Sequence, residues 1–160
     1  LITKGWETGG GDERADVGTV AQIQHVEALD EDRYALVAVG TRRIRINAWL
    51  PDDPYPLADV DAWPDVEPDP PGLTLQVAAS HARVLAAVAL ATELDGIRAE
   101  STDLDISEDP LVASYHLAAL APIGPADRYK LLSAGGPSAR LDLLDEILDD
   151  VEAMMKFRLS

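Results

Sequence analysis

The stretch that decides the fold covers residues 16–50 and reads DVGTVAQIQHVEALDEDRYALVAVGTRRIRINAWL. Within residues 17–24, small or apolar side chains occupy every second position; these are Val17, Thr19, Ala21 and Ile23. A period of two is typical of a strand that has one buried face. Residues 29–33 follow as a polar break, and we predict a turn there.

A second strand is expected at residues 34–39, which are apolar on both faces and so indicate a central place in a sheet. Gly40 and Thr41 predict a second tight connection. The residues beyond it alternate, with Ile44, Ile46 and Ala48 expected to point inward and Arg43, Arg45 and Asn47 outward. Three consecutive strands on short loops favour an antiparallel sheet, and a further strand is expected at residues 59–63.

The period changes from two to that of a helix after residue 72. Apolar residues recur at helical spacing from Leu73 to Leu94, which predicts one long helix. Asp109 and Pro110 indicate the start of another, because Asp accepts from free amides and Pro suits the first turn. Further helices are expected at residues 125–133 and after Pro137. The last has an acidic face made of Asp142, Asp145, Glu146, Asp149 and Asp150. We expect that face to be solvated, with docking of a partner as the alternative.

The strand region resembles the amino-terminal domain of Lon protease, the LON substrate-binding domain. That family has a glycine-small-Val-Ala-x-Ile strand, an aromatic-x-Leu strand, a glycine and an arginine-rich strand. The matching positions are Gly18, Thr19, Val20, Ala21, Ile23, Tyr34, Leu36, Gly40, Arg43 and Ile46. Residues 4–7 (KGWE) resemble the family's strand ending in Gly-x-Glu, and residues 54–57 (PYPL) its Pro-Tyr-Leu step.

The resemblance implies an α+β fold in which a mainly antiparallel, PUA-like pseudo-barrel sheet is followed by a small C-terminal helical bundle. We expect the β-rich part at residues 1–70 and the helical part at residues 71–160. In that family, a strand, a short helix and another strand precede the segment that corresponds to residues 1–3 of this sequence. The first strands of the sheet are therefore expected to be missing from residues 1–70.

Composition restricts the classes of partner. The 160 residues carry a net charge of −16, which disfavours nucleic acid because phosphates require clustered Lys and Arg. No apolar run of membrane-spanning length and no signal peptide were recognised, so we expect a protein of the cytoplasm without membrane contact. The absence of cysteine from the sequence rules out disulfides and thiolate metal sites within it.

The sequence contains short segments that resemble catalytic motifs, but no complete motif. Residues 136–139 (GPSA) resemble the segment around the catalytic serine of the Lon peptidase domain, but only Lys156 follows Ser138 as a candidate base. No Walker A motif occurs, and His25, His81 and His116 lack the spacing of a zinc site. We therefore expect no enzymatic activity, no cofactor and no metal.

The resemblance implies a non-catalytic module that binds unfolded polypeptide or a protein partner. A weak homo-oligomer of the chain is also expected. The binding residues that it implies are Gly5, Glu7, Thr19, Tyr34, Arg43 and Arg45. The row of arginines at positions 42, 43 and 45 either pairs with Asp59 and Asp61 or meets a partner's carboxylates or phosphates. An unpaired sheet edge could accept an extended peptide. Two alternatives stay open: a PUA-like domain that senses a small ligand or nucleotide, and an amino-terminal fragment of an ATP-dependent Lon protease.

Overall fold

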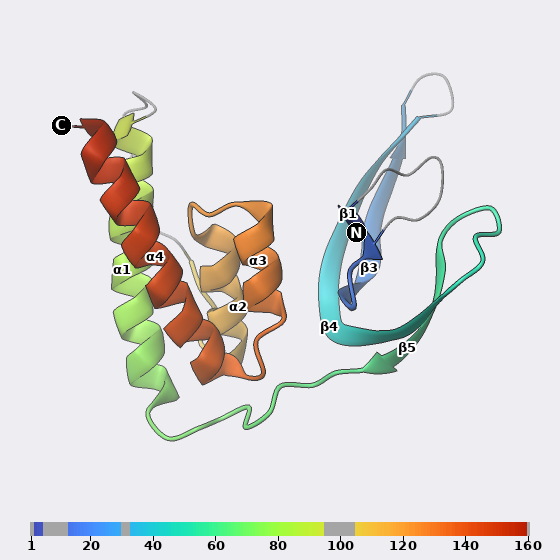
Figure 1. Ribbon diagram of the computed structural model, residues 1–160, viewed down its shortest axis with the longest axis horizontal. Coiled ribbons are helices and arrows are strands. Elements are labelled where there is room, and N and C mark those ends of the chain that lie inside the picture. The colour runs from blue at the N-terminus through green and yellow to red at the C-terminus, as the bar shows by residue number, and fades with distance from the viewer. Residues whose placement is uncertain (1, 5–12, 30–32, 95–104, 160) are drawn as a thin grey trace. The chain divides into compact units, whose positions relative to one another are not determined.

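The computed structural model describes residues 2–4, 13–29, 33–94 and 105–159 and separates the chain into two compact units. Unit 1 comprises Leu1–Pro64 and carries the strands, and unit 2 comprises Asp65–Ser160 and carries the helices. Figure 1 shows the elements of each unit. The predicted α+β class, with an antiparallel sheet first and helices after it, is confirmed.

The described strands of unit 1 form two antiparallel sheets. The smaller pairs β1 (Ile2–Lys4) with β2 (Glu13–Arg14). The larger has the order β3-β4-β5, where β3 is Val17–Ala28, β4 is Tyr34–Leu50 and β5 is Leu57–Ala62. β5 pairs only with the second half of β4, so the first half has β3 as its neighbour among the described strands. This first half and β3 form a two-stranded arm.

The predicted connection at Gly40 and Thr41 is wrong, because β4 runs through both residues as one strand. Val20 pairs with Arg42 and Ala21 with Gly40, so Thr41 is the extra residue of a β-bulge. Its hydroxyl donates to the carbonyl of Val20 at 3.0 Å. A Cβ on Gly40 would lie 3.0 Å from the methyl of Thr19, so the strands approach closely here. Glycine thus marks a bulge at this position.

The prediction of which side chains point inward along residues 43–48 is also wrong in part. Ile44 and Ile46 are half-buried and Ala48 is exposed, whereas Arg43, which was expected to point outward, is only 5% exposed. Arg43 is covered because its guanidinium lies over the indole of Trp63, at 4.4 Å from the ring centroid. A side chain with a long aliphatic stem can be buried in this way while its charge stays on an aromatic face.

The described residues of unit 2 form four helices with a common apolar core. They are α1 (Leu73–Leu94), α2 (Pro110–Leu120), α3 (Pro125–Leu132) and α4 (Pro137–Leu159). α1 and α4 lie side by side, α2 packs against both, and α3 packs against α4 and α2 (Figure 1). The fully buried core side chains include Val84, Leu117, Leu131, Leu141, Leu144 and Leu148. The predicted start at Asp109 is confirmed, because its Oδ1 accepts from the amide of Leu111 at 2.9 Å.

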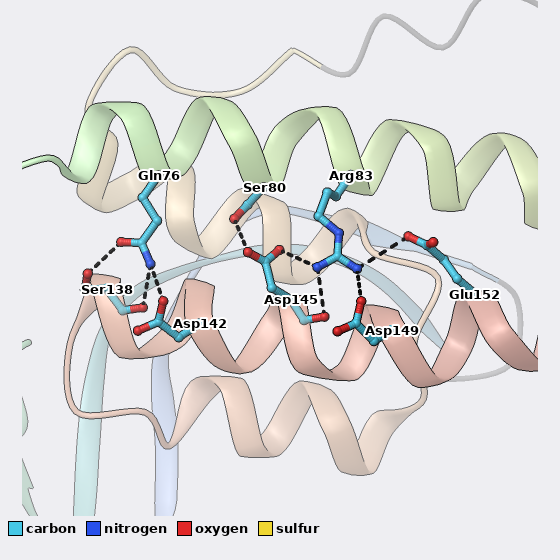
Figure 2. A network of polar contacts seen from close by, with 8 residues as sticks. All are labelled: Gln76, Ser80, Arg83, Ser138, Asp142, Asp145, Asp149 and Glu152. Carbon is cyan, nitrogen blue, oxygen red and sulfur yellow. Dashed lines mark hydrogen bonds and ion pairs between the residues drawn. The ribbon is translucent and has the colours of Figure 1, made fainter.

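The acidic face of α4 is exposed as expected, apart from the half-buried Asp145, but three of its residues also form contacts within the protein. Asp142, Asp145 and Asp149 contact α1, as Figure 2 shows. The contacts form an α1–α4 polar network, whose members are Gln76, Ser80 and Arg83 on α1 and Ser138, Asp142, Asp145, Asp149 and Glu152 on α4. The sequence prediction missed it because α1 carries these three polar residues between its apolar ones.

Among the described residues, one helix, α1, is long and apolar enough to cross a membrane by length and composition alone. This differs from the expectation that no run reaches spanning length. The same helix supplies Leu73, Val77, Val84 and Ala87 to the core and Arg83 to the α1–α4 polar network. A core helix passes the same test, so the finding is weak evidence for a membrane segment.

Candidate functional site

Three of the predicted binding residues lie on β3 and β4 next to the two-stranded arm. Thr19 on β3 pairs with Arg43 on β4, and Arg45 lies two residues further along the same strand, opposite Val17. The structure therefore brings Thr19, Arg43 and Arg45 together. Gly5 and Glu7 lie outside the described residues.

Trp63 organises the two arginines. The guanidinium of Arg43 lies 4.4 Å from the indole centroid and that of Arg45 lies 4.6 Å from it. The backbone amide of Trp63 donates to the carbonyl of Arg43 at 3.1 Å, which fixes the residue next to β4. Cation–π contacts of this kind favour the position of a guanidinium over an aromatic face.

The expected pairing of these arginines with acids on β5 is replaced, in the case of Asp61, by a different contact. The carboxylate of Asp61 accepts from the side-chain amide of Asn47 at 2.9 Å. Within the part of the chain that the structure describes, Arg45 makes its contact with Trp63 and no ion pair with Asp59 or Asp61. Its side chain is exposed.

Tyr34 lies away from this group. It begins β4, nine positions before Arg43, and pairs with Ala28 at the far end of β3. At about 3.3 Å per residue, roughly 30 Å of strand separates the two residues. The predicted residues therefore do not form one compact site.

Tyr34 belongs instead to a continuous apolar surface, which we call the apolar face. Residues that lie opposite each other in an antiparallel pair project to the same side of the sheet. On this side the pairs are Ala28–Tyr34, Val26–Leu36, Ile23–Ala38 and Ala21–Gly40. All eight residues are uncharged and apolar in character, apart from the hydroxyl of Tyr34. Ile23 is 57% exposed, Leu36 57% and Tyr34 62%.

A second bulge creates this face. Ile23 pairs with Ala38 and His25 with Val37, so Gln24 is an extra residue in β3. In a regular strand without the bulge, Ile23 and Val26 would project to opposite sides, because they are three positions apart and side chains alternate along a strand. The bulge therefore brings both onto the apolar face.

The opposite side of the arm is mixed. Its pairs are Gln22–Val39, His25–Val37 and Glu27–Ala35. The polar members all lie on β3, whereas β4 contributes apolar ones. We call this side the mixed face. β3 thus has apolar side chains on one side and polar ones on the other.

The outer edge of β3 completes the candidate site. β3 has 12 residues and pairs with β4 along one edge, and none of the other described strands pairs with its second edge. The backbone amides and carbonyls on such an edge are free to bond another extended chain. The candidate site is therefore the apolar face together with this edge.

The family comparison agrees with the sheet-then-helices architecture. The ATP-dependent protease La (LON) substrate-binding domain matches residues 2–150 of the chain. The chain belongs to this family. No curated protein matches the sequence.

Two solved structures share the fold of this LON domain. A Lon N-terminal domain protein from Xanthomonas campestris is 21% identical, with a TM-score of 0.55 over 81% of this chain and 66% of that one. The N-terminal domain of a Mycobacterium avium complex Lon protease is also 21% identical, with a TM-score of 0.59 over 86% of this chain and 72% of that one. The chain therefore spans about two thirds of the length of these relatives.

The serine that resembles the Lon peptidase nucleophile has a structural role in this LON domain. The Ser138 hydroxyl donates to Oε1 of Gln76 at 2.6 Å, and Nζ of Lys156 donates to Glu152 at 3.2 Å. Ser138 and Lys156 are 18 positions apart on α4, which corresponds to about 27 Å at 1.5 Å per residue. These two residues cannot act together as a nucleophile and its base.

The helical unit of the LON domain also has a pocket of about 260 Å³. It is lined by Tyr115, Ala118, Ala119, Arg128, Leu132 and Arg140. Arg140 is fully buried and bonded to Asp65 and Ser114, whereas Arg128 is exposed. The pocket therefore offers an apolar lining with one accessible cation.

The sequence analysis named Tyr34 as a candidate binding residue but did not predict that Ile23, Val26 and Leu36 are exposed. The signal was present, because residues 34–39 are apolar on both sides. A two-sided apolar strand was interpreted as a buried central one. In the structure this half of β4 is exposed on both sides.

Proposed function

We propose that this LON domain is a non-catalytic module that binds exposed apolar segments of unfolded polypeptide or of a protein partner. The observation that carries the proposal is the apolar face, whose side chains remain more than half exposed at Ile23, Leu36 and Tyr34. Contiguous apolar patches of this kind on a soluble domain are typical of interaction sites. The family description, a substrate-binding domain, fits the same role.

The energetics suit weak, broad recognition. Covering one half-exposed aliphatic side chain contributes about 1 kcal/mol to the binding free energy. The entropy lost on association offsets part of the total contribution from all covered side chains. An exposed apolar ladder can therefore hold many sequences with modest affinity. That behaviour fits a domain that recognises unfolded chains rather than one defined ligand.

The proposal also covers catalytic activity, nucleic-acid binding and cellular location. We infer that ATP hydrolysis and peptide-bond cleavage are absent from this chain and are the work of other domains or proteins. A net charge of −16 disfavours nucleic acid as a partner. We also infer a cytoplasmic location, which the cysteine-free composition and the family resemblance support.

The test is fluorescence anisotropy with a labelled, permanently unfolded protein at low and moderate salt. We expect saturable binding that survives moderate salt, because apolar contacts are not screened. Leu36→Gln should weaken it, whereas Leu75→Gln, at an exposed leucine of α1, should not. Absence of binding at high protein concentration, or equal losses for both variants, would contradict the proposal.

A small-ligand function is the second candidate, and the pocket in the helical unit favours it. An apolar molecule with one carboxylate would suit an apolar lining with Arg128 at its rim. Protection of Arg128 from chemical modification by a panel of small carboxylates would support this function. No protection by any of them would leave the polypeptide function as the candidate.

A further inference from the structure

We infer that the arm binds polypeptide by strand addition to the outer edge of β3, and that it selects segments in which apolar residues alternate with basic ones. The inference rests on the proposed function and specifies its binding mode and its substrate class. It combines the open edge, the two unlike sides of β3 and the charge of the chain.

The edge provides the backbone part of the recognition. β3 is 12 residues long, and the described strands leave one of its two edges open. A polypeptide in extended conformation can pair its amides and carbonyls with that edge, which gives affinity without requiring a particular sequence. A helical or compact segment cannot do so, and unfolded chains are therefore the natural ligands.

The apolar face sets one half of the side-chain pattern. Every second residue of an added strand would project to the side of Ile23 and Val26, the members of the face on β3 with large side chains. Neighbouring side chains across paired strands lie about 4.5–5.5 Å apart, close enough for direct apolar contact. Apolar residues at these positions would cover surface that is now exposed.

The mixed face sets the other half. The intervening residues of the added strand would project to the side of Gln22, His25 and Glu27. Glu27 is an exposed carboxylate, so a Lys or Arg near it would be favoured and an acidic residue disfavoured. The net charge of −16 acts in the same direction over a longer range.

The same charges argue against a second copy of the chain as the occupant of the edge. Pairing of β3 with β3 would bring two Glu27 side chains to one sheet and two chains of charge −16 together. Like charges at close range destabilise such a pairing. The occupant that the observations favour is therefore a neutral or basic extended polypeptide.

The first experiment uses three labelled peptides of equal length and matched hydrophobicity, measured by anisotropy against the whole chain. One alternates valine with lysine, one has the same composition in two blocks, and one alternates valine with glutamate. We expect the alternating lysine peptide to bind about tenfold more tightly than either of the others. Equal binding of the alternating and blocked lysine peptides would overturn strand addition.

Backbone methylation separates strand addition from simple apolar contact. In an extended peptide, alternate amides point to opposite edges, so N-methyl groups can be placed on one edge or on the other. Methylation of the edge that faces β3 should abolish binding, and methylation of the opposite edge should leave it intact. Equal effects from both edges would contradict the inference.

A charge reversal on the protein tests the mixed face. Glu27→Lys should weaken the lysine peptide about threefold and strengthen the glutamate peptide, a size typical of exposed ion pairs. Glu146→Lys, which makes the same change at an exposed position of α4, should have a smaller and equal effect on both peptides. Identical responses to the two substitutions would remove Glu27 from the recognition.

The outcomes also separate this inference from the proposed function. If the unfolded protein binds but the peptides show no preference for pattern or methylated edge, the apolar face binds polypeptide by another mode. If neither the unfolded protein nor any peptide binds, both proposals fail. Concentration-dependent self-association that blocks the peptides would identify a second copy as the occupant of the edge.

Discussion

Nη2 of Arg140 lies 2.5 Å from Oδ1 of Asp65, and the two side chains are 0% and 8% exposed. Asp65 is the first residue of the helical unit and Arg140 lies in α4. The hydroxyl of Tyr115 donates to the other oxygen of Asp65 at 2.6 Å, and its ring covers the guanidinium at 3.6 Å. Nη1 of Arg140 donates to Ser114 at 2.7 Å. A buried ion pair with these bonds fastens the entry of the unit to its core.

The first prediction concerns this pair. Arg140→Met should lower the free energy of unfolding of the helical unit by about 3–5 kcal/mol, because it leaves a buried carboxylate without its cation. Urea unfolding followed by circular dichroism at 222 nm reports this unit, since the four described helices belong to it. Lys130→Met removes an exposed ion pair with Asp127 and should cost less than about 1 kcal/mol. Equal losses would show that burial of Arg140 does not matter.

A second prediction concerns two adjacent glycines before α4. A Cβ on Gly136 would lie 2.3 Å from the carbonyl oxygen of Val66, whereas one on Gly135 would meet nothing within 4 Å. The amide of Val66 also donates to the carbonyl of Gly135 at 2.9 Å, so the two segments are held together. Gly136→Ala should therefore destabilise the helical unit by about 1–3 kcal/mol.

Gly135→Ala is the matched control, and it should change the unfolding midpoint little. The measurement is again urea unfolding followed by helical circular dichroism. A harmless Gly136→Ala would mean that residues 65–66 do not press against this loop in solution.

The third prediction is a pH dependence that arises at Asp145 in the α1–α4 polar network. Burial raises the pKa of the Asp145 carboxyl above its ordinary value of 3.8, and Arg83 offsets part of that effect. A raised pKa means that the folded state binds the proton more readily than the unfolded state. The contribution of this group to stability is therefore present below pH 3.8 and is lost as the pH rises through the folded pKa.

Asp145→Asn should remove that decline, so the difference in unfolding midpoint between variant and wild type should change across this window. Asp52 gives the opposite sign, because the hydrogen bond from Arg14 lowers its pKa below 3.8. Its contribution is present above pH 3.8 and is lost as the pH falls through the folded pKa. Asp52→Asn should therefore be less stable than wild type mainly above pH 3.8, and this difference should disappear as the pH falls through the folded pKa. Parallel pH profiles for all three proteins would contradict both assignments.

Comparison of the elements shows what local sequence can and cannot predict. The bounds of α1 were predicted correctly because helical periodicity is carried by residues close in sequence. The course of β4 was not, because Gly40 and Thr41 suit a turn and a bulge equally well, and only pairing with Val20 and Ala21 decides between them. Exposure of the arm was missed for a related reason: an apolar strand looks the same whether another layer covers it or not.

Contacts between distant residues explain the remaining differences. Arg43 was expected at the surface, and it is buried because Trp63, 20 positions later, returns beside it. Arg140 received no role in the sequence interpretation, and its partner Asp65 lies 75 positions away. No periodicity or spacing signal connects such residues, so these parts of the fold could not be read from one sequence.

The fourth prediction separates the two arginines at Trp63. Arg43→Ala should destabilise unit 1 by about 1–3 kcal/mol, because it removes a buried side chain and its contact with the indole. Arg45→Ala should cost less, since Arg45 is exposed. Tryptophan fluorescence reports this unit, because Trp6, Trp49 and Trp63 all belong to it. A larger loss for Arg45→Ala would contradict the burial of Arg43.

The last prediction concerns the apolar face. Ile23→Lys and Leu36→Lys should abolish binding of an unfolded polypeptide, because each places a hydrated charge where an apolar segment would lie. Both side chains are 57% exposed, so neither substitution should shift the unfolding midpoint of unit 1 by much. Val66→Lys adds the same charge at an exposed residue that belongs to the helical unit and is not part of the arm.

Anisotropy and tryptophan fluorescence together decide the outcome of these three substitutions. Loss of binding with unchanged unfolding for the two arm variants, and neither change for Val66→Lys, would place recognition on the apolar face. If the arm variants instead unfold at lower urea concentration, the face is a packing surface in solution. Binding that survives both substitutions would move the polypeptide site away from the arm and would remove the basis of the strand-addition inference.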